Sequence, residues 1–388
     1  MLTLVLFLAI LSLLVLAHEF GHFITARKSG MRVYEFGWGF PPRAFGVYRD
    51  PENKKFIWVW GKGKSSLKDT AGGEESAAEF PATVYSVNWL PLGGFCKIKG
   101  ENGEDKAEPD SFGYQKTWKK IIVLVAGVTM NFLLAAALLS VGFVIGLPAD
   151  MNGLEDSDAI IVQAPAVMIQ QVEKNSPAEK ATLMVGDKIL SINSIEIKYS
   201  GQMVSLIKEI GKGELAIKIS RSGEEKMIKA VLEGGSAADS RLGVYLADAG
   251  VIRYPWYLAV YKGFVAAGIG VINILVAFYF LFKNLIIGQG LSLDVSGPVG
   301  IAIVVGQSAK LGFNYLINVT AMISLSLAVI NILPFPALDG GRAMFILIEK
   351  FTGKKVPLKY EQLAHTIGFA LLMALIVVVT WRDVKGLF

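Results

Sequence analysis

Residues 1–26 read MLTLVLFLAILSLLVLAHEFGHFITA, and this stretch decides the fold. It lacks the basic start of a cleavable signal peptide, and its apolar character continues past position 17 to a first basic pair at Arg27 and Lys28. About 20 apolar residues are needed to cross the hydrocarbon core of a bilayer as a helix. The stretch is therefore predicted to be a retained membrane-spanning helix with two histidines and a glutamate inside it.

The composition of the whole chain also indicates a membrane protein. The 388 residues are 53% hydrophobic and 18% charged, with a mean hydropathy of +0.49, which is too apolar for a soluble protein of this size. The net charge is +5, but the basic residues flank apolar segments without any nucleic-acid motif, so we expect no nucleic-acid partner. The single cysteine, Cys96, excludes an intrachain disulfide.

Apolar windows long enough to span occur five times in the sequence. Four are predicted transmembrane helices, at 1–30, 120–148, 314–345 and 360–382. The loop at 31–119 carries many lysines and arginines close to the spans on either side of it. By the positive-inside rule this loop is cytoplasmic, and the N-terminus faces outward.

Two regions are predicted to be non-helical or mixed. Within 31–119, the runs FIWVW at 56–60 and TVYSVNWLPLGGFCKIKG at 83–100 are rich in aromatic and β-branched residues, which predicts a β-rich, membrane-associated module. Residues 156–236 combine strand patterns with the helical segment GQMVSLIKEI, which predicts one compact α/β domain. Because this domain follows the second span, we expect it outside the cytoplasm.

The sequence His18-Glu-Phe-Gly-His22 is an H-E-x-x-H pattern. At about 100° per residue, positions i and i+4 share one helix face, so both imidazoles can reach one metal ion. Neutral imidazole suits zinc, which in catalytic sites takes three protein ligands and one water, and Glu19 is the expected general base. Ionisable groups at membrane depth are costly, so these side chains are expected to face the interior of the bundle.

A third protein ligand must come from elsewhere in the chain. The candidates near later spans are Asp339, Glu361 and His365. Asp339 lies in NILPFPALDGGRAMF, where Pro334 and Pro336 interrupt a helix and the following glycines allow close backbone approach. This break favours Asp339, although the residue is also a candidate N-cap of the helix that follows.

Together these motifs resemble the site-2 protease family of intramembrane metalloproteases, of the bacterial RseP type. The likeness extends along nearly the whole chain. It includes GWGFPPRAFG at 37–46, NWLPLGGFCKIKGENGED at 88–105, AGVTMNFLLA at 126–135 and SGPVGIA at 296–302. The segment at 175–194 is similar to the PDZ domain that this family carries. Val128 stands where the family usually has a proline, and only one PDZ-like unit fits the length available.

The resemblance implies a set of residue roles and a substrate class. It implies His18, His22 and Asp339 as zinc ligands and Glu19 as catalytic base. It implies substrate-positioning roles for Asn131, Asn331, Pro334 and Pro336. The implied substrates are membrane-spanning proteins already cut by another protease, such as anti-sigma factors, or remnant signal peptides. The implied location is the bacterial inner membrane, with the PDZ-like domain extracytoplasmic.

The fifth apolar window, at 254–290, presents a conflict between hydropathy and chemistry. If the histidines and Asp339 share one zinc ion, their two helices must run in the same direction, which requires an odd number of crossings between them. The span at 120–148 supplies one crossing. We therefore predict that 254–290 forms an interfacial or re-entrant helix, despite being apolar enough to span.

The sequence thus predicts a polytopic α-helical membrane protein with about four transmembrane helices, a β-rich membrane-associated loop and one extracytoplasmic PDZ-like domain. Its predicted activity is that of an intramembrane zinc metalloendopeptidase. A membrane-tethered zinc peptidase acting on soluble proteins should carry H-E-x-x-H outside a span. A non-catalytic PDZ-bearing scaffold needs no such motif.

Overall fold

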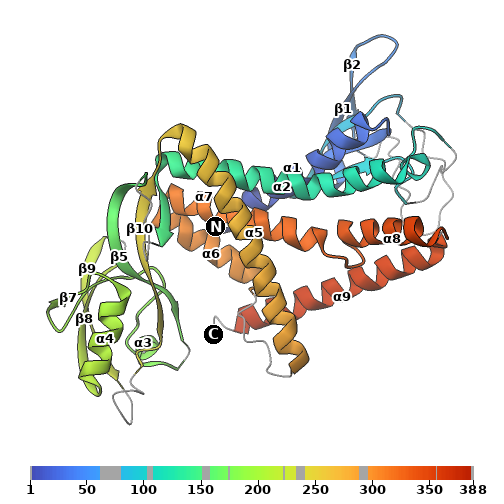
Figure 1. The fold of residues 1–388 in the computed structure, drawn as a ribbon. Coiled ribbons are helices and arrows are strands. Elements are labelled where there is room, and N and C mark those ends of the chain that lie inside the picture. Colours follow the sequence, from blue (N-terminus) through green and yellow to red (C-terminus); the bar gives the residue numbers. More distant parts are fainter. Residues whose placement is uncertain are drawn as a thin grey trace. The chain divides into compact units, whose positions relative to one another are not determined.

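The chain is described by a computed structural model (Figure 1). It describes residues 2–61, 80–102, 108–150, 158–173, 175–221, 223–232, 241–287, 296–354 and 356–385. Parts of the predicted ranges 31–119, 156–236 and 254–290 lie outside these residues. The described chain divides into two compact units, of which one comprises 1–136, 266–306 and 319–388, and the other 137–265 and 307–318.

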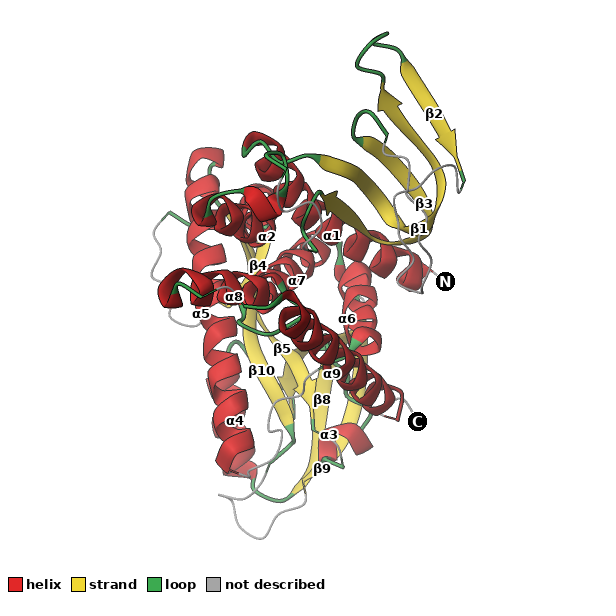
Figure 2. Ribbon diagram, turned by 90° about the vertical axis from the view of Figure 1, so that its right-hand side faces the viewer, coloured by secondary structure: helices red, strands yellow, loops and turns green. Residues whose placement is uncertain are grey.

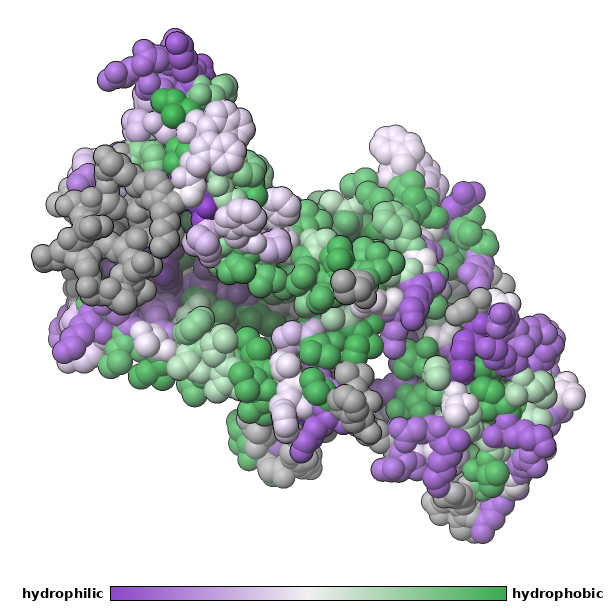
Figure 3. Space-filling model, turned by 180° about the vertical axis from the view of Figure 1, so that it is seen from behind, coloured by the Kyte–Doolittle hydropathy of each residue, from purple (hydrophilic) through white to green (hydrophobic). Residues whose placement is uncertain are grey.

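Among the described residues, five helices are long and apolar enough to cross a membrane. They are α1 (Leu2–Lys28), α2 (Thr117–Ile145), α5 (Trp256–Ile287), α7 (Phe313–Ile332) and α9 (Leu358–Lys385). On the face shown in Figure 3, apolar side chains gather over the middle of the molecule, as expected for a surface that faces lipid. The predicted class, a polytopic α-helical membrane protein, is confirmed. A shorter apolar helix, α6 (Pro298–Leu311), was not predicted.

The segment predicted as a third span at 314–345 is two helices separated by a bend. Helix α7 ends at Ile332, and α8 (Asp339–Thr352) begins at Asp339. Proline lacks an amide hydrogen and blocks helix continuation, so Pro334 and Pro336 account for the break. Ala337 has φ of 82°, a left-handed conformation that costs a non-glycine residue about 1–2 kcal/mol.

The first turn of α8 folds back tightly onto this bend. A Cβ atom on Gly340 would lie 2.2 Å from the Leu333 carbonyl oxygen, and one on Gly341 would lie 2.2 Å from that of Phe335. No side chain fits at either distance. The two glycines therefore allow the chain to reverse within a few residues and bring Asp339 to the end of α7.

A three-stranded antiparallel sheet lies against α1 (Figure 2). Its strands are β1 (Val33–Arg49), β2 (Phe56–Trp60) and β3 (Val84–Ile98), in the order β2-β1-β3. Trp38 of β1 donates its indole N–H to the Ser12 hydroxyl of α1 at 2.5 Å. This sheet corresponds to the predicted β-rich module, although β1 was not among the strands expected from the sequence.

The second unit contains an α/β domain with a larger sheet. Its strands are β4 (Leu147–Asp150), β5 (Ile160–Val172), β6 (Lys188–Ile192), β7 (Ile195–Glu196), β8 (Gly213–Arg221), β9 (Glu224–Leu232) and β10 (Val244–Arg253). The order is β4-β10-β5-β6-β8-β9, with β7 paired to β6, and the helices are α3 (Pro177–Lys180) and α4 (Ser200–Ile210). Alternate residues of β8, such as Ile217 and Ile219, are fully buried in its core. The sheet extends beyond the predicted 156–236 at both ends, through β4 and β10.

Candidate metal centre

Three potential metal ligands from distant parts of the sequence meet at one point. His18 Nε2 lies 2.9 Å from Asp339 Oδ2, and His22 Nε2 lies 3.2 Å from the same oxygen. The two Nε2 atoms are 3.1 Å apart. Both imidazoles are buried, each with 7% of the residue surface exposed. Helix α1 supplies the histidines one turn apart, and the bend after α7 supplies the carboxylate.

The geometry of this group fits a small tetrahedral cation. Zinc ligands at about 2.0–2.2 Å from the ion lie about 3.4 Å from one another, close to the separations present here. Among the residues that the structure describes, His18, His22 and Asp339 form the only group of this kind. Glu361 and His365, the other candidates from the sequence, are not part of it. Asp339 is not an N-cap, because Leu338 holds that position and no side chain caps the helix.

The outer nitrogens of both histidines have partners that direct Nε2 toward the centre. His22 Nδ1 lies 2.8 Å from the Val123 carbonyl oxygen, to which it donates, so the unprotonated Nε2 is the atom that faces the candidate centre. The side-chain Nδ2 of the fully buried Asn131 lies 3.4 Å from His18 Nδ1, and its Oδ1 has no hydrogen-bond partner among the described residues. A half-turn of this amide brings Oδ1 to His18 Nδ1–H and satisfies both groups. Asn131, predicted to position substrate, therefore contacts a candidate ligand, and it also lines a cavity beside Asp339.

Glycines make room for the imidazoles between α1 and α2. A Cβ atom on Gly127 would lie 2.5 Å from His22 Nε2 and 2.7 Å from His18 Nε2. On α1, a Cβ atom on Gly21 would lie 2.4 Å from the Ala126 carbonyl oxygen. The two helices therefore approach each other closely enough for α2 to enclose the histidines.

Glu19, the predicted general base, lines the same cavities as the candidate ligands. Its carboxylate accepts a hydrogen bond from the backbone N–H of Cys96 in β3, so the sheet helps to orient it. Glu19 and Asp339 both line a cavity of about 520 Å³ that also reaches Arg342 and His365. They line a second cavity of about 220 Å³ as well, together with His18, Asn131 and Asn331. Glu19 is thus accessible from two spaces that meet at the centre.

The remaining predicted site residues differ in their relation to these cavities. Asn331 lines the smaller cavity, which agrees with a role in contacting substrate. Pro334 and Pro336 are not among the described residues lining either cavity, and they act by shaping the bend. The sequence did not single out Arg342, which pairs with Glu101 beside the larger cavity and lies 3.3 Å from Asn102 Oδ1.

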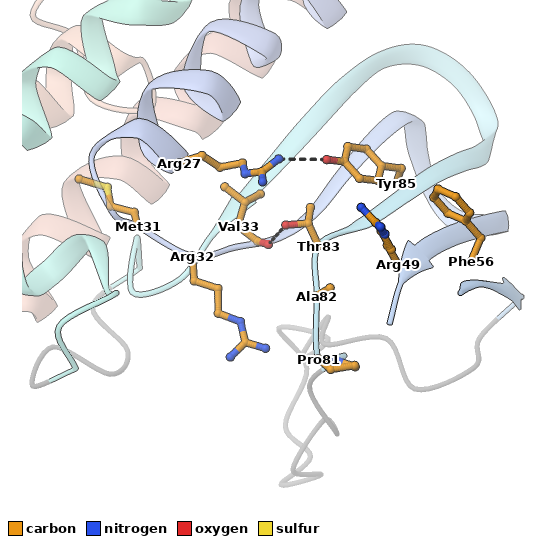
Figure 4. A pocket seen from close by; sticks show the side chains of 10 residues that line it. All are labelled: Arg27, Met31, Arg32, Val33, Arg49, Phe56, Pro81, Ala82, Thr83 and Tyr85. Carbon is orange, nitrogen blue, oxygen red and sulfur yellow. Dashed lines mark hydrogen bonds between the residues drawn. The ribbon is translucent and has the colours of Figure 1, made fainter. Parts of the chain in front are cut away.

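A further cavity of about 700 Å³ lies where α1 ends against the β1–β3 sheet, away from these residues (Figure 4). Arg27, Arg32 and Arg49 line it. Arg27 donates to the Tyr85 hydroxyl at 3.2 Å, whereas Arg32 donates to the Phe80 carbonyl at 2.7 Å and points away from the other two. The three guanidinium groups do not converge, so this cavity lacks the arrangement of an anion site.

The chain matches a known peptidase family over most of its length. The model of peptidase family M50 matches residues 6–57 and 76–375. The chain belongs to peptidase family M50. As an M50 peptidase it is a zinc metalloendopeptidase of the site-2 protease type, and zinc is its cofactor. The resemblance inferred from the motifs is confirmed, and the alternative of a non-catalytic scaffold is wrong.

Several M50 relatives match almost their full length. A putative zinc metalloprotease of Clostridium acetobutylicum is 30% identical over 371 residues, covering 96% of this chain and 94% of that protein. The zinc metalloprotease RasP of Shouchella clausii is 28% identical, and the match covers 100% of this chain and 99% of that protein. The regulator of sigma-W protease RasP of Bacillus subtilis is 26% identical, and the match covers 100% of this chain and 99% of that protein.

Several solved structures match the chain, and one of them matches only part of it. It is the PDZ domain of an SdrC-like protein from Listeria monocytogenes, 21% identical, with a TM-score of 0.20. The match covers 23% of this chain and 95% of that one.

Replacing Asp339 with asparagine removes the negative charge from the centre while keeping the size of the side chain. We expect Asp339→Asn to weaken zinc binding by at least about tenfold, measured by competition with a chelator on the purified full chain. Glu361→Gln, which alters the rejected candidate ligand, should bind zinc like the wild type. Equal zinc affinity for Asp339→Asn and wild type would remove Asp339 from the ligand set.

Alanine at position 127 should prevent both histidines from adopting their places. We expect the zinc affinity of Gly127→Ala to fall by a factor of about ten or more, because the added Cβ would overlap the Nε2 atoms of both histidines. The matched control is Gly268→Ala on α5, where an added Cβ meets no atom within 4 Å. A Gly127→Ala protein with a full zinc complement would contradict the close approach of α2 to the histidines.

Proposed function

We propose that this protein cleaves peptide bonds within the membrane-spanning segments of other membrane proteins. The observation that carries the proposal is the convergence of His18, His22 and Asp339, within 4.8 Å of one another, beside Glu19 on an apolar helix long enough to span. The site lies on a span and not in a separate soluble domain, which favours intramembrane substrates over soluble ones.

The proposed roles follow from the position of each side chain. His18, His22 and Asp339 hold the zinc ion, which when bound lowers the pKa of a water molecule and polarises the scissile carbonyl. Glu19 accepts the proton of that water and delivers it to the leaving amine. The Cys96 N–H keeps the Glu19 carboxylate turned toward the centre. Asn331, in the smaller cavity, is positioned to contact the substrate backbone.

A substrate helix must be unwound before its amides can be attacked, because helical carbonyl groups are already hydrogen-bonded. An unwound segment can add as a strand to an exposed sheet edge. Strands β2 and β3 are the two edges of the β1–β3 sheet, and β3 contacts Glu19 through Cys96. We propose that β3 holds the extended substrate beside the base, with β2 as the alternative edge.

The substrates we propose are single-span membrane proteins already cut by another protease, such as anti-sigma factors, or remnant signal peptides. The name of the Bacillus subtilis relative, regulator of sigma-W protease, supports the first class. The α/β domain of the second unit is proposed to be PDZ-like and extracytoplasmic, in a bacterial inner membrane, where it screens substrates before they reach the bundle.

The contacts between helices support the predicted course of the chain through the membrane. Gly21 of α1 packs on Ala126 of α2, whereas His18 packs on Asn131, so α1 and α2 are antiparallel. Ser324 of α7 donates its hydroxyl to the Asn131 carbonyl at 2.8 Å. Farther along α2, Gly142 faces Ile317 of α7, so α7 is antiparallel to α2. Helices α1 and α7 therefore run in the same direction.

Contacts at the start and at the end of the segment at 256–297 support placing both ends on the same side of the membrane. At its start, the Tyr254 N–H bonds to the Phe143 carbonyl at 2.9 Å, at the C-terminal end of α2. At its end, the Gly300 N–H donates to Asp383 Oδ2 at 2.8 Å, near the C-terminal end of α9. Helices α2 and α9 are both proposed to run outward. We therefore propose that α5 does not complete a crossing.

Substitution of the base should separate catalysis from metal binding. We expect Glu19→Gln to keep zinc but lower the turnover of a single-span reporter by at least about 100-fold, since glutamine cannot accept a proton. Zinc content and cleavage rate are measured on the same preparation, with Glu361→Gln as control. Turnover at the wild-type rate in Glu19→Gln would exclude Glu19 as the base.

Cysteine labelling tests the course of α5. With Cys96 replaced by serine, cysteines placed at Ser296 and Lys310 should react with a membrane-impermeant maleimide added outside intact cells. A cysteine at Lys354, after α8, should react only after permeabilisation. If the Ser296 position behaves like Lys354, α5 crosses the membrane and the four-span topology is wrong.

A further inference from the structure

The bend that presents Asp339 to the metal centre contains a backbone conformation that needs support. Ala337, two residues before Asp339, has φ of 82°. An L-amino acid with a Cβ atom rarely adopts this conformation unless neighbouring groups hold it there. Its backbone N–H donates to His365 Nδ1 on α9 at 2.8 Å.

This hydrogen bond fixes the chemical form of His365. A nitrogen that accepts an N–H bond carries no proton, so the imidazole has its proton on Nε2. The Nδ1 lone pair is occupied by Ala337 and is not directed at the metal centre. His365 nevertheless lines the same cavity as Glu19, His22 and Asp339.

Helix α9 contacts the bend at a second point, one turn farther along. A Cβ atom on Gly368 would lie 2.3 Å from the Pro336 carbonyl oxygen. His365 and Gly368 thus face the bend together, the first with a hydrogen bond and the second by close packing. Within this contact, His365 supplies the directional interaction, because a glycine can only permit approach.

We propose that His365 is a positioning residue for the metal centre. By accepting the Ala337 N–H it holds the left-handed turn, and the turn aims the Asp339 carboxylate at His18 and His22. The inference rests on the proposed metal centre. Helix α9 supplies none of the three proposed ligands, but through His365 it controls the placement of Asp339.

The substitution His365→Phe keeps an aromatic ring against Phe345, whose ring centre lies 5.7 Å from that of His365, but removes the acceptor. The substitution His365→Asn restores an acceptor, since its Oδ1 is bonded to Cγ as Nδ1 is in histidine. Thr366→Val is the matched control. Thr366 lines the same cavity, but among the described residues its hydroxyl donates only to the Gln362 carbonyl oxygen of its own helix, at 2.9 Å.

The experiment measures zinc affinity by chelator competition, together with kcat and KM for a single-span reporter, on the purified full chain. Loss of an outer partner of a metal site lowers metal affinity or activity by about 10–100-fold. We expect His365→Phe to lose zinc affinity and kcat in this range with little change in KM. His365→Asn should recover most of both, and Thr366→Val should match the wild type.

Each other result has a definite meaning. Wild-type affinity and kcat in His365→Phe would overturn the inference. An equal defect in His365→Asn and His365→Phe would also overturn it, because the acceptor would not be what His365 supplies. If the wild type itself binds no zinc, or Asp339→Asn binds it equally well, the metal centre fails and not the role of His365 alone.

Discussion

Close approach of backbones in an apolar interior is the constraint on which this structure depends. The three candidate ligands, from α1 and the first residue of α8, can share one point only if the surrounding helices leave no gap for lipid and do not clash with the imidazoles. Glycines at 21 and 127 set the distance between α1 and α2, and Gly340 and Gly341 set the reversal that carries Asp339. The metal chemistry is thus made possible by residues that have no functional groups.

The apolar interior also requires that the buried polar groups have hydrogen-bond partners within the protein. In hydrocarbon a histidine nitrogen without a partner is costly, so each ring needs a second contact besides the metal. The Val123 carbonyl and the Asn131 amide supply these contacts from α2. Helix α2 therefore does more than cross the membrane, because it provides both the space for the ligands and the partners that orient them.

The sequence predicted the parts of the site that depend on local geometry. The spacing of His18 and His22 follows from the helix repeat, and the break before Asp339 follows from Pro334 and Pro336. Contacts between distant segments were not visible in the same way. The role of Asn131 as a partner of His18, the pairing of Arg342 with Glu101 and the bond from Ala337 to His365 depend on how helices pack. Strand β1 was missed because its glycines and prolines are typical of loops. Strand β10 (Val244–Arg253) was missed because it follows the predicted end of the domain at 236.

The two cavities that meet at Glu19 and Asp339 bear on inhibitor chemistry. A compound with a zinc-binding head placed at the centre has two directions in which to extend. One leads into a space of about 520 Å³ with Arg342, Glu101 and His365 in its wall, and the other into about 220 Å³ beside Asn131 and Asn331. A bulky arm with a charged or hydrogen-bonding end suits the first, and a short amide-like arm suits the second. Selectivity among zinc peptidases can therefore be sought in the arms of a compound and not in its metal-binding head.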